Sequence, residues 1–147
     1  SLVISGKSPP ADFIGEAGTR SRLRVVGFVP DIRPLLRDAV AFVNPMWEGA
    51  GTRLKVLHAM AAGCPVISTA IGAEGIDYTA GKNILLAETA NAFADCVSQL
   101  IKDPVMAGSI GRAGRALVEE RYDWNKLLES FEQELIQRVK CHANRTH

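Results

Sequence analysis

The sequence has no long apolar run and no excess of charge of either sign. None of its hydrophobic stretches approaches the ~20 residues that a membrane-spanning helix needs, and no signal-peptide pattern opens it. Its 17 Lys and Arg against 16 Asp and Glu leave a formal net charge of +1. Bulk charge therefore gives no reason to bind nucleic acid or an anionic membrane. We predict a soluble chain without a nucleic-acid partner.

Cysteine is scarce, and its three positions do not form a site. Cys64, Cys96 and Cys141 are odd in number and far apart, so neither a disulfide framework, a redox pair nor metal-ligand spacing is indicated. Cys64 begins an apolar run and is expected to be a buried small hydrophobe. Cys141, His142 and His147 could be imagined as metal ligands, but nothing between them orders the tail. We predict no metal, and the free cysteines favour a reducing compartment.

Short apolar runs alternate with longer helical patterns along the 147 residues, which is the length of one domain. The runs are hydrophobic on both faces, as in a parallel sheet covered by helices on each side. We expect strands over residues 2–5, 23–28, 39–44, 65–69 and 83–86. The sequence predicts an α/β fold, a Rossmann-like doubly wound parallel sheet forming a single domain over residues 1–147.

The helices between these strands have recognisable starts. Asp31 can cap a helix that has Pro34 in its first turn, and Asp103 followed by Pro104 repeats this pattern. Asp123 can cap the last helix, along which five apolar residues form one stripe: Leu127, Leu128, Phe131, Leu135 and Val139. Because Ser1 lies almost inside a strand, we also expect the chain to start part-way into a domain.

The best candidate site follows the third strand. In open parallel sheets, ligands bind beyond the carboxyl ends of the strands. There, Gly49-Ala50-Gly51-Thr52 leads into a helix predicted over residues 53–62. Such a turn presents free N–H groups and the positive end of the helix dipole to an anion, for example a diphosphate. Arg53 and Lys55 add cations, and Glu48 can accept hydrogen bonds from sugar hydroxyls. This chemistry fits a ligand that carries both phosphate and polyol groups.

Each of these residues also has a purely structural interpretation. The glycines could only turn the chain, Arg53 and Lys55 could be solvated charges, and Glu48 could be a surface carboxylate. His58 would ordinarily be a partly buried structural histidine, and Met46 and Trp47 would be packing residues. Other nucleotide-binding and catalytic signatures fail, since the turn lacks the third glycine of a dinucleotide fingerprint and no P-loop, nucleophile elbow or zinc cluster is present.

Residues 49–57 and 59–69 together resemble the donor-site signature of the retaining family-four glycosyltransferases of the GT-B fold. Weaker matches flank them at residues 2–7, 27–31 and 121–124. The resemblance implies the C-terminal, nucleotide-sugar-binding domain of that fold, truncated at its N-terminal end. It implies transfer of a sugar from a nucleotide-diphosphate sugar to an acceptor with retention, without a metal or other cofactor.

Carried over by position, the resemblance also assigns roles. The catalytic candidate is Glu48, which with the backbone of Gly49, Ala50 and Gly51 would hold the donor sugar. The N–H groups of Gly51 and Thr52 would face the diphosphate, with Arg53 and Lys55 nearby. The residues beside the base would be Gly6, Lys7, Phe28 and Val29.

Two positions depart from the family pattern. His58 stands where the family usually has a glutamate that binds the ribose hydroxyls. Neutral imidazole offers one acceptor nitrogen, so one charge-assisted bond is lost, about 1.5–3 kcal/mol of donor binding. Nine residues separate Glu48 from His58, against a common family spacing of seven.

The resemblance leaves the acceptor half of the enzyme outside this chain. We expect an acceptor glycan or lipid-linked acceptor to be bound by an N-terminal domain, and this chain alone to neither transfer sugar nor bind donor tightly. We expect a cytoplasmic location, with membrane association only through the missing parts, at the inner membrane face. Two other functions stay open: an epimerase acting on nucleotide sugars, and a non-catalytic module that has lost the ribose-binding glutamate.

Overall fold

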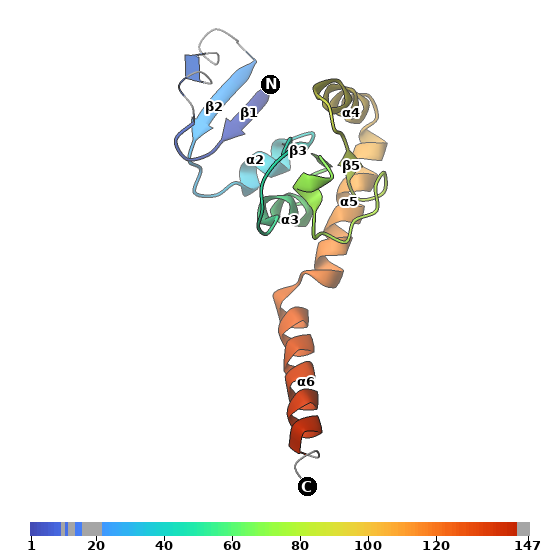
Figure 1. Cartoon of the computed structure of the whole chain (residues 1–147). Coiled ribbons are helices and arrows are strands. Elements are labelled where there is room, and N and C mark those ends of the chain that lie inside the picture. Colours follow the sequence, from blue (N-terminus) through green and yellow to red (C-terminus); the bar gives the residue numbers. More distant parts are fainter. Residues whose placement is uncertain (10, 12–13, 16–21, 144–147) are drawn as a thin grey trace. The chain divides into compact units, whose positions relative to one another are not determined.

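The computed structural model describes residues 1–9, 11, 14–15 and 22–143. The chain forms two compact units, Ser1–Pro34 and Leu35–His147. In the first unit, strands β1 (Leu2–Ser5) and β2 (Leu23–Gly27) pair in parallel (Figure 1). That the two units together act as one domain stays a prediction.

The second unit contains a three-stranded parallel sheet in the order β3-β4-β5. Its strands are β3 (Phe42–Asn44), β4 (Val66–Ser68) and β5 (Leu85–Leu86). The helices are α2 (Arg33–Asp38), which spans the boundary between the units, α3 (Leu54–Ala61), α4 (Ala90–Lys102), α5 (Pro104–Arg121) and α6 (Trp124–Ala143), with a 3₁₀ turn η1 (Ile71–Ala73).

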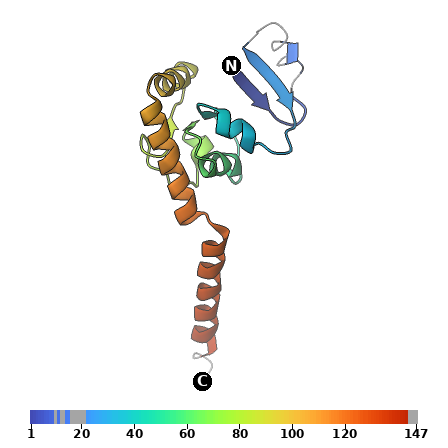
Figure 2. The ribbon, with the colours of Figure 1, turned by 180° about the vertical axis from the view of Figure 1, so that it is seen from behind.

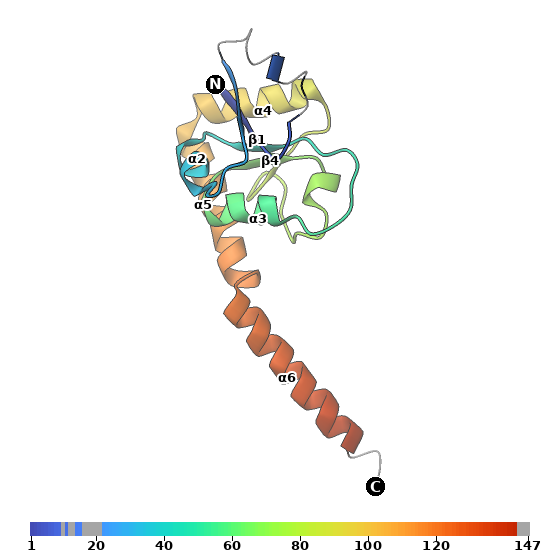
Figure 3. The same cartoon turned by 90° about the vertical axis from the view of Figure 1, so that its left-hand side faces the viewer.

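Helices cover both faces of the three-stranded sheet. Figure 3 shows α4 on one side of β4 and α3 on the other. Helix α5 contacts both α3 and α4 and runs beside α3 (Figure 2). Buried side chains of the sheet, of α4 and of α5 form a core cluster, which includes Ile67, Leu85, Phe93, Leu100 and Ile110. The predicted α/β class with parallel strands is confirmed, and the strands are divided between two sheets.

Strands β3 and β5 begin two or three residues later than their apolar runs predict. The Ala39 N–H donates to the Leu36 carbonyl and closes the end of α2, so β3 begins only at Phe42. Asn83 belongs to a turn, because its N–H donates to the Thr79 carbonyl and its Oδ1 accepts from the Thr79 N–H. Strand β5 therefore begins at Leu85. These local hydrogen bonds replace the ladder bonds of a longer strand.

The three predicted caps are confirmed. Asp31 Oδ1 accepts from the Arg33 N–H at 3.0 Å, and its side-chain bonds to Arg33 lower the pKa of this carboxyl. Asp103 accepts from the Met106 N–H at 2.9 Å at the start of α5. Asp123 accepts from the Asn125 N–H at 2.8 Å at the start of α6. Each carboxylate satisfies an N–H that the first helical turn leaves free.

The apolar stripe of α6 is present but not covered. Its side chains are between 44% exposed at Leu127 and 68% exposed at Val139. Among the described residues, no helix combines the length and the apolar character needed to cross a membrane. His147 lies outside the described residues, as do the side chains of Cys141 and His142.

Cys64 is buried as predicted, with 4% of its surface exposed. Burial raises the pKa of its thiol to about 11.

Candidate functional site

The carboxyl ends of β3 and β4 stand side by side in the second unit. Asn44, the last residue of β3, is in register with Ser68, the last residue of β4. The loop that carries the glycine turn starts after Asn44, and the loop that contains η1 starts after Ser68. Parallel pairing therefore brings the two loops together at one edge, the position where open α/β sheets bind ligands.

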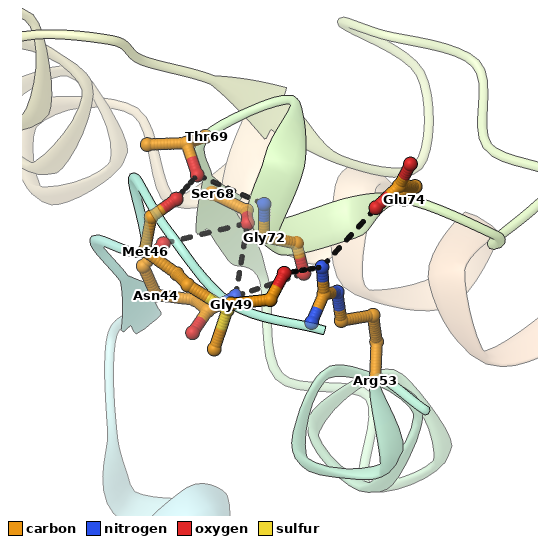
Figure 4. A network of polar contacts seen from close by, with 8 residues as sticks. All are labelled: Asn44, Met46, Gly49, Arg53, Ser68, Thr69, Gly72 and Glu74. Atoms are coloured by element: carbon orange, nitrogen blue, oxygen red, sulfur yellow. Dashed lines mark hydrogen bonds and ion pairs between the residues drawn. The ribbon is translucent and has the colours of Figure 1, made fainter. Parts of the chain in front are cut away.

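A polar network holds these two loops together (Figure 4). Asn44 Nδ2 donates to Ser68 Oγ at 3.1 Å and to the Gly72 carbonyl at 3.0 Å. The Thr69 hydroxyl donates to the Met46 carbonyl and accepts from the Gly72 N–H. Ser68 and Thr69 are fully buried, and Asn44 is half-buried. The network fixes the chain on both sides of the strand ends.

Gly72 packs directly against the side chains of this network. A Cβ atom at this position would lie 2.5 Å from both Asn44 Nδ2 and Ser68 Oγ, and 3.0 Å from Thr69 Oγ1. These distances are shorter than van der Waals contact, so any side chain would push the network apart. The network requires glycine here.

The glycine turn is exposed and has the conformation that only glycine adopts easily. Gly49 has φ of 133° and Gly51 has φ of 104°. Glu48, Ala50 and the rest of residues 48–52 are exposed. Among the described residues, no hydrogen bond to the backbone N–H groups of residues 49–52 is found. The turn thus offers unpaired donors to a ligand next to an accessible carboxylate.

Helix α3 begins immediately after this turn, and no negatively charged side chain lies in its first turn. Its N-cap, Arg53, makes no side-chain capping bond. Lys55 is exposed in that first turn. The positive end of the helix dipole and two cationic residues therefore lie together, which favours an anion.

Arg53 is not solvated. Its side chain is only 4% exposed, and its Nη2 donates to the Gly49 carbonyl at 3.3 Å and to Glu74 Oε2 at 3.4 Å (Figure 4). The Arg53 Nε is buried without a hydrogen-bond partner among the described residues. The guanidinium is buried against the backbone of the glycine turn. This burial excludes the interpretation of Arg53 as a solvated charge.

The histidine that departs from the family pattern is accessible. His58 is exposed on α3, whereas Val56, Ala59 and Met60 face the core. A histidine that only fills the core would not be exposed, so the structural interpretation does not hold. Its ring is free to contact a ligand.

Trp47 behaves as a packing residue. Its indole Nε1 donates to the Glu88 carbonyl at 3.0 Å, and its ring meets the buried Phe93 ring edge-on, with centroids 6.3 Å apart. Glu88 Oε1 in turn accepts from the Ala70 N–H. Trp47, which directly precedes Glu48, thereby connects the loop after β3 to the segment that leads into α4.

The residues expected beside the base lie in the first unit. Gly6 donates its N–H to the Gly27 carbonyl at 2.8 Å, and Lys7 Nζ is 5.9 Å from the centroid of the exposed Phe28 ring. Val29 follows Phe28 and is half-buried. The end of β1 and the loop after β2 therefore form one local cluster.

Sequence reasoning assigned no role to Asn44, Ser68, Thr69, Gly72 or Glu74. All five lie at or just after the strand ends, where small and polar residues gather. This clustering was the signal in the sequence that could have pointed to them. Their partners are more than 20 residues away in sequence, so the individual bonds could not be read from it.

A sequence model of the family described as "Glycosyl transferases group 1" matches residues 1–103, which is most of the chain. This chain belongs to that family. The expected resemblance to GT-B glycosyltransferases is confirmed, and the chain has the α/β fold of their C-terminal domain.

Two curated relatives match part of the chain. An uncharacterized 44.6 kDa protein in the cps region of Klebsiella pneumoniae is 33% identical over 93 residues, covering 63% of this chain and 24% of its own length. A D-inositol 3-phosphate glycosyltransferase of Arthrobacter sp. (strain FB24) is 31% identical over 120 residues, covering 77% and 28%. This chain therefore spans about a quarter of the length of these relatives.

Solved structures agree on the fold. The C-terminal domain of a group 1 glycosyl transferase (LpcC) from Francisella tularensis is 28% identical with a TM-score of 0.66, covering 77% of this chain and 60% of that one. Sucrose-phosphate synthase from Thermosynechococcus elongatus is 24% identical with a TM-score of 0.79, covering 95% and 39%. HepE from Anabaena, solved with UDP-glucose, is 19% identical with a TM-score of 0.77, covering 92% and 40%.

Proposed function

We propose that this chain is the donor-binding domain of a glycosyltransferase that moves a hexosyl group from a nucleotide-diphosphate sugar to an acceptor with retention of configuration. The observation that supports this most strongly is the exposed glycine turn beside Glu48, at the N-terminus of α3 and the shared edge of β3 and β4. Unpaired N–H groups suit a diphosphate, and the adjacent carboxylate suits sugar hydroxyls.

In this proposal the turn binds the reacting end of the donor. The N–H groups of Gly51 and Thr52 donate to the diphosphate, and Lys55 adds a solvent-accessible positive charge. Glu48 and the backbone of Gly49 and Ala50 hold the sugar. The base lies near the cluster of Gly6, Lys7, Phe28 and Val29, and His58 lies at the ribose.

The chemistry would depend on oriented dipoles without a metal or other cofactor. As the bond between the sugar and the diphosphate breaks, negative charge grows on the leaving phosphate. The N–H groups of the turn and the positive end of α3 stabilise that charge, while Glu48 stabilises the oxocarbenium-like sugar. The acceptor, a glycan or a lipid-linked molecule, is bound by parts of a longer protein outside this chain.

A titration of the full-length protein with a panel of nucleotide sugars tests the proposal, with thermal stabilisation as the readout. A donor present at 100 times its Kd raises stability by about 2.7 kcal/mol. Glu48→Gln should abolish transfer without lowering Tm, because Glu48 is exposed. Glu119→Gln, which changes an exposed carboxylate on α5, is the matched control. Full transfer by Glu48→Gln would contradict the assigned role.

His58, in place of the family's usual glutamate, favours a second candidate, a binding module that has lost catalysis. Restoring the carboxylate with His58→Glu in the full-length protein separates the two. If the site has degenerated, turnover or donor affinity rises, by up to about 10-fold to 100-fold for one charge-assisted bond. If the imidazole serves a specialised donor, activity falls.

We further propose that the 147-residue chain alone neither transfers sugar nor binds donor tightly. The glycine turn belongs to one compact unit and the cluster proposed for the base to the other. In this proposal the acceptor is bound by parts of a longer protein. Transfer detected with this chain alone would contradict this part of the proposal.

A further inference from the structure

Arg53 is the only charged side chain that is buried among the described residues. It is also the N-cap of α3, where the helix dipole opposes a positive charge. A buried guanidinium at such a position is costly unless a negative charge compensates it. In the described part of the chain, the carboxylate within salt-bridge distance of Arg53 is that of Glu74.

The same Arg53 nitrogen contacts both Glu74 and the backbone of the glycine turn. Arg53 Nη2 lies 3.4 Å from Glu74 Oε2 and 3.3 Å from the Gly49 carbonyl oxygen (Figure 4). Gly49 and Gly51 adopt positive φ angles, and glycine has the widest backbone freedom of any residue. A turn of this kind keeps a single orientation only where something outside it holds its peptide groups.

We propose that Glu74 is a positioning residue for the donor site. Its carboxylate keeps the Arg53 guanidinium inside the protein, and the guanidinium holds the Gly49 carbonyl. This contact sets the direction of the peptide groups that follow, including the N–H groups of Gly51 and Thr52. The inference rests on the proposed function for its consequence, which is binding of the diphosphate.

Glu74 could act in the opposite way, as a competitor of the ligand. Its side chain is 73% exposed, so a phosphate could displace it from Arg53. The two roles predict opposite results when the charge is removed. A positioning role weakens phosphate binding on removal, whereas competition strengthens it.

The test uses Glu74→Gln in the 147-residue chain, which keeps the shape of the side chain and removes its charge. Backbone ¹⁵N relaxation of Gly49, Gly51 and Thr52 without ligand is the first readout. We expect order parameters near ~0.85 in the wild type and below ~0.6 in Glu74→Gln. Glu74→Asp, which keeps the charge, should recover part of the order. Tm should fall, because Arg53 is left buried without its compensating charge, so the spectra are recorded well below the Tm of the variant.

Glu119→Gln is the matched control. Glu119 also pairs with an arginine, Arg115, at 2.7 Å on the exposed face of α5. This variant should leave the order parameters of the turn at wild-type values. A loss of order in both variants would indicate a general loosening of the fold and would overturn the inference.

UDP, titrated to millimolar concentration and followed by amide shifts, is the second readout. We expect Glu74→Gln to weaken UDP binding by about fivefold, the upper range for a partly exposed ion pair. Three results would each overturn the inference. The turn of Glu74→Gln could keep wild-type order parameters, the turn could already be disordered in the wild type, or the variant could bind UDP more tightly. If the order parameters fall as expected and the wild type shows no UDP shifts, the positioning role stands and UDP binding by this chain fails.

Discussion

Replacing Gly72 with alanine should destabilise the second unit strongly. The added methyl carbon would lie 2.5 Å from Asn44 Nδ2 and from Ser68 Oγ, about 1 Å inside van der Waals contact. Neither neighbour can move freely, because Asn44 Nδ2 also donates to the Gly72 carbonyl and Ser68 is fully buried. The methyl group must therefore displace the η1 turn or break the bonds of Asn44.

The magnitude combines two costs. Overpacking of a closely packed site costs about 1–3 kcal/mol, and each hydrogen bond lost costs about 0.5–1.5 kcal/mol. We expect Gly72→Ala to lower the free energy of unfolding by about 2–4 kcal/mol. For a unit of this size, Tm should fall by roughly 10 °C or more.

Urea denaturation followed by circular dichroism measures this change, and Gly108→Ala supplies the control. A Cβ atom at Gly108 in α5 would meet only the end of the exposed Arg112 side chain, at 3.1 Å. Alanine in the interior of a helix is favoured over glycine by about 0.5–1 kcal/mol, so this variant should be slightly more stable. Equal midpoints for the two variants would refute the close approach at Gly72.

Further predictions concern groups away from the glycine turn. At pH 8, iodoacetamide should modify Cys64 about 100-fold more slowly in the folded protein than in the unfolded chain. Burial raises the pKa of the Cys64 thiol from 9.0 to about 11, and only the thiolate reacts. Equal modification rates, measured by peptide mass spectrometry, would contradict the burial of Cys64. Because the folded state holds this proton more tightly, the contribution of Cys64 to stability is complete below pH 9 and declines as pH rises through 11. Asp103→Ala removes the bond to the Met106 N–H and should cost about 1 kcal/mol in the urea assay, whereas an unchanged midpoint would show that this cap is dispensable.

Much of the candidate site could be predicted because its signals are local. Glycines at 49 and 51, followed at once by a helix, indicate an exposed helix N-terminus, and the structure has this arrangement. The alternative that Arg53 is a solvated surface charge is excluded by its burial. Whether an arginine side chain turns outward or inward depends on what lies beside it, and here Glu74, 21 residues later, lies beside it.

The amino-acid sequence alone determined the α/β class, the three aspartate caps and the membership of the glycosyltransferase family. These features depend on residues within one or two turns of each other, where propensity, capping and motif spacing act. The tertiary structure decided the exposure of the α6 stripe, the burial of Arg53, and the network that joins Asn44 to Gly72. Each of these depends on which distant segments meet, because burial and polar pairing are properties of the assembled layers, and no local pattern specifies them.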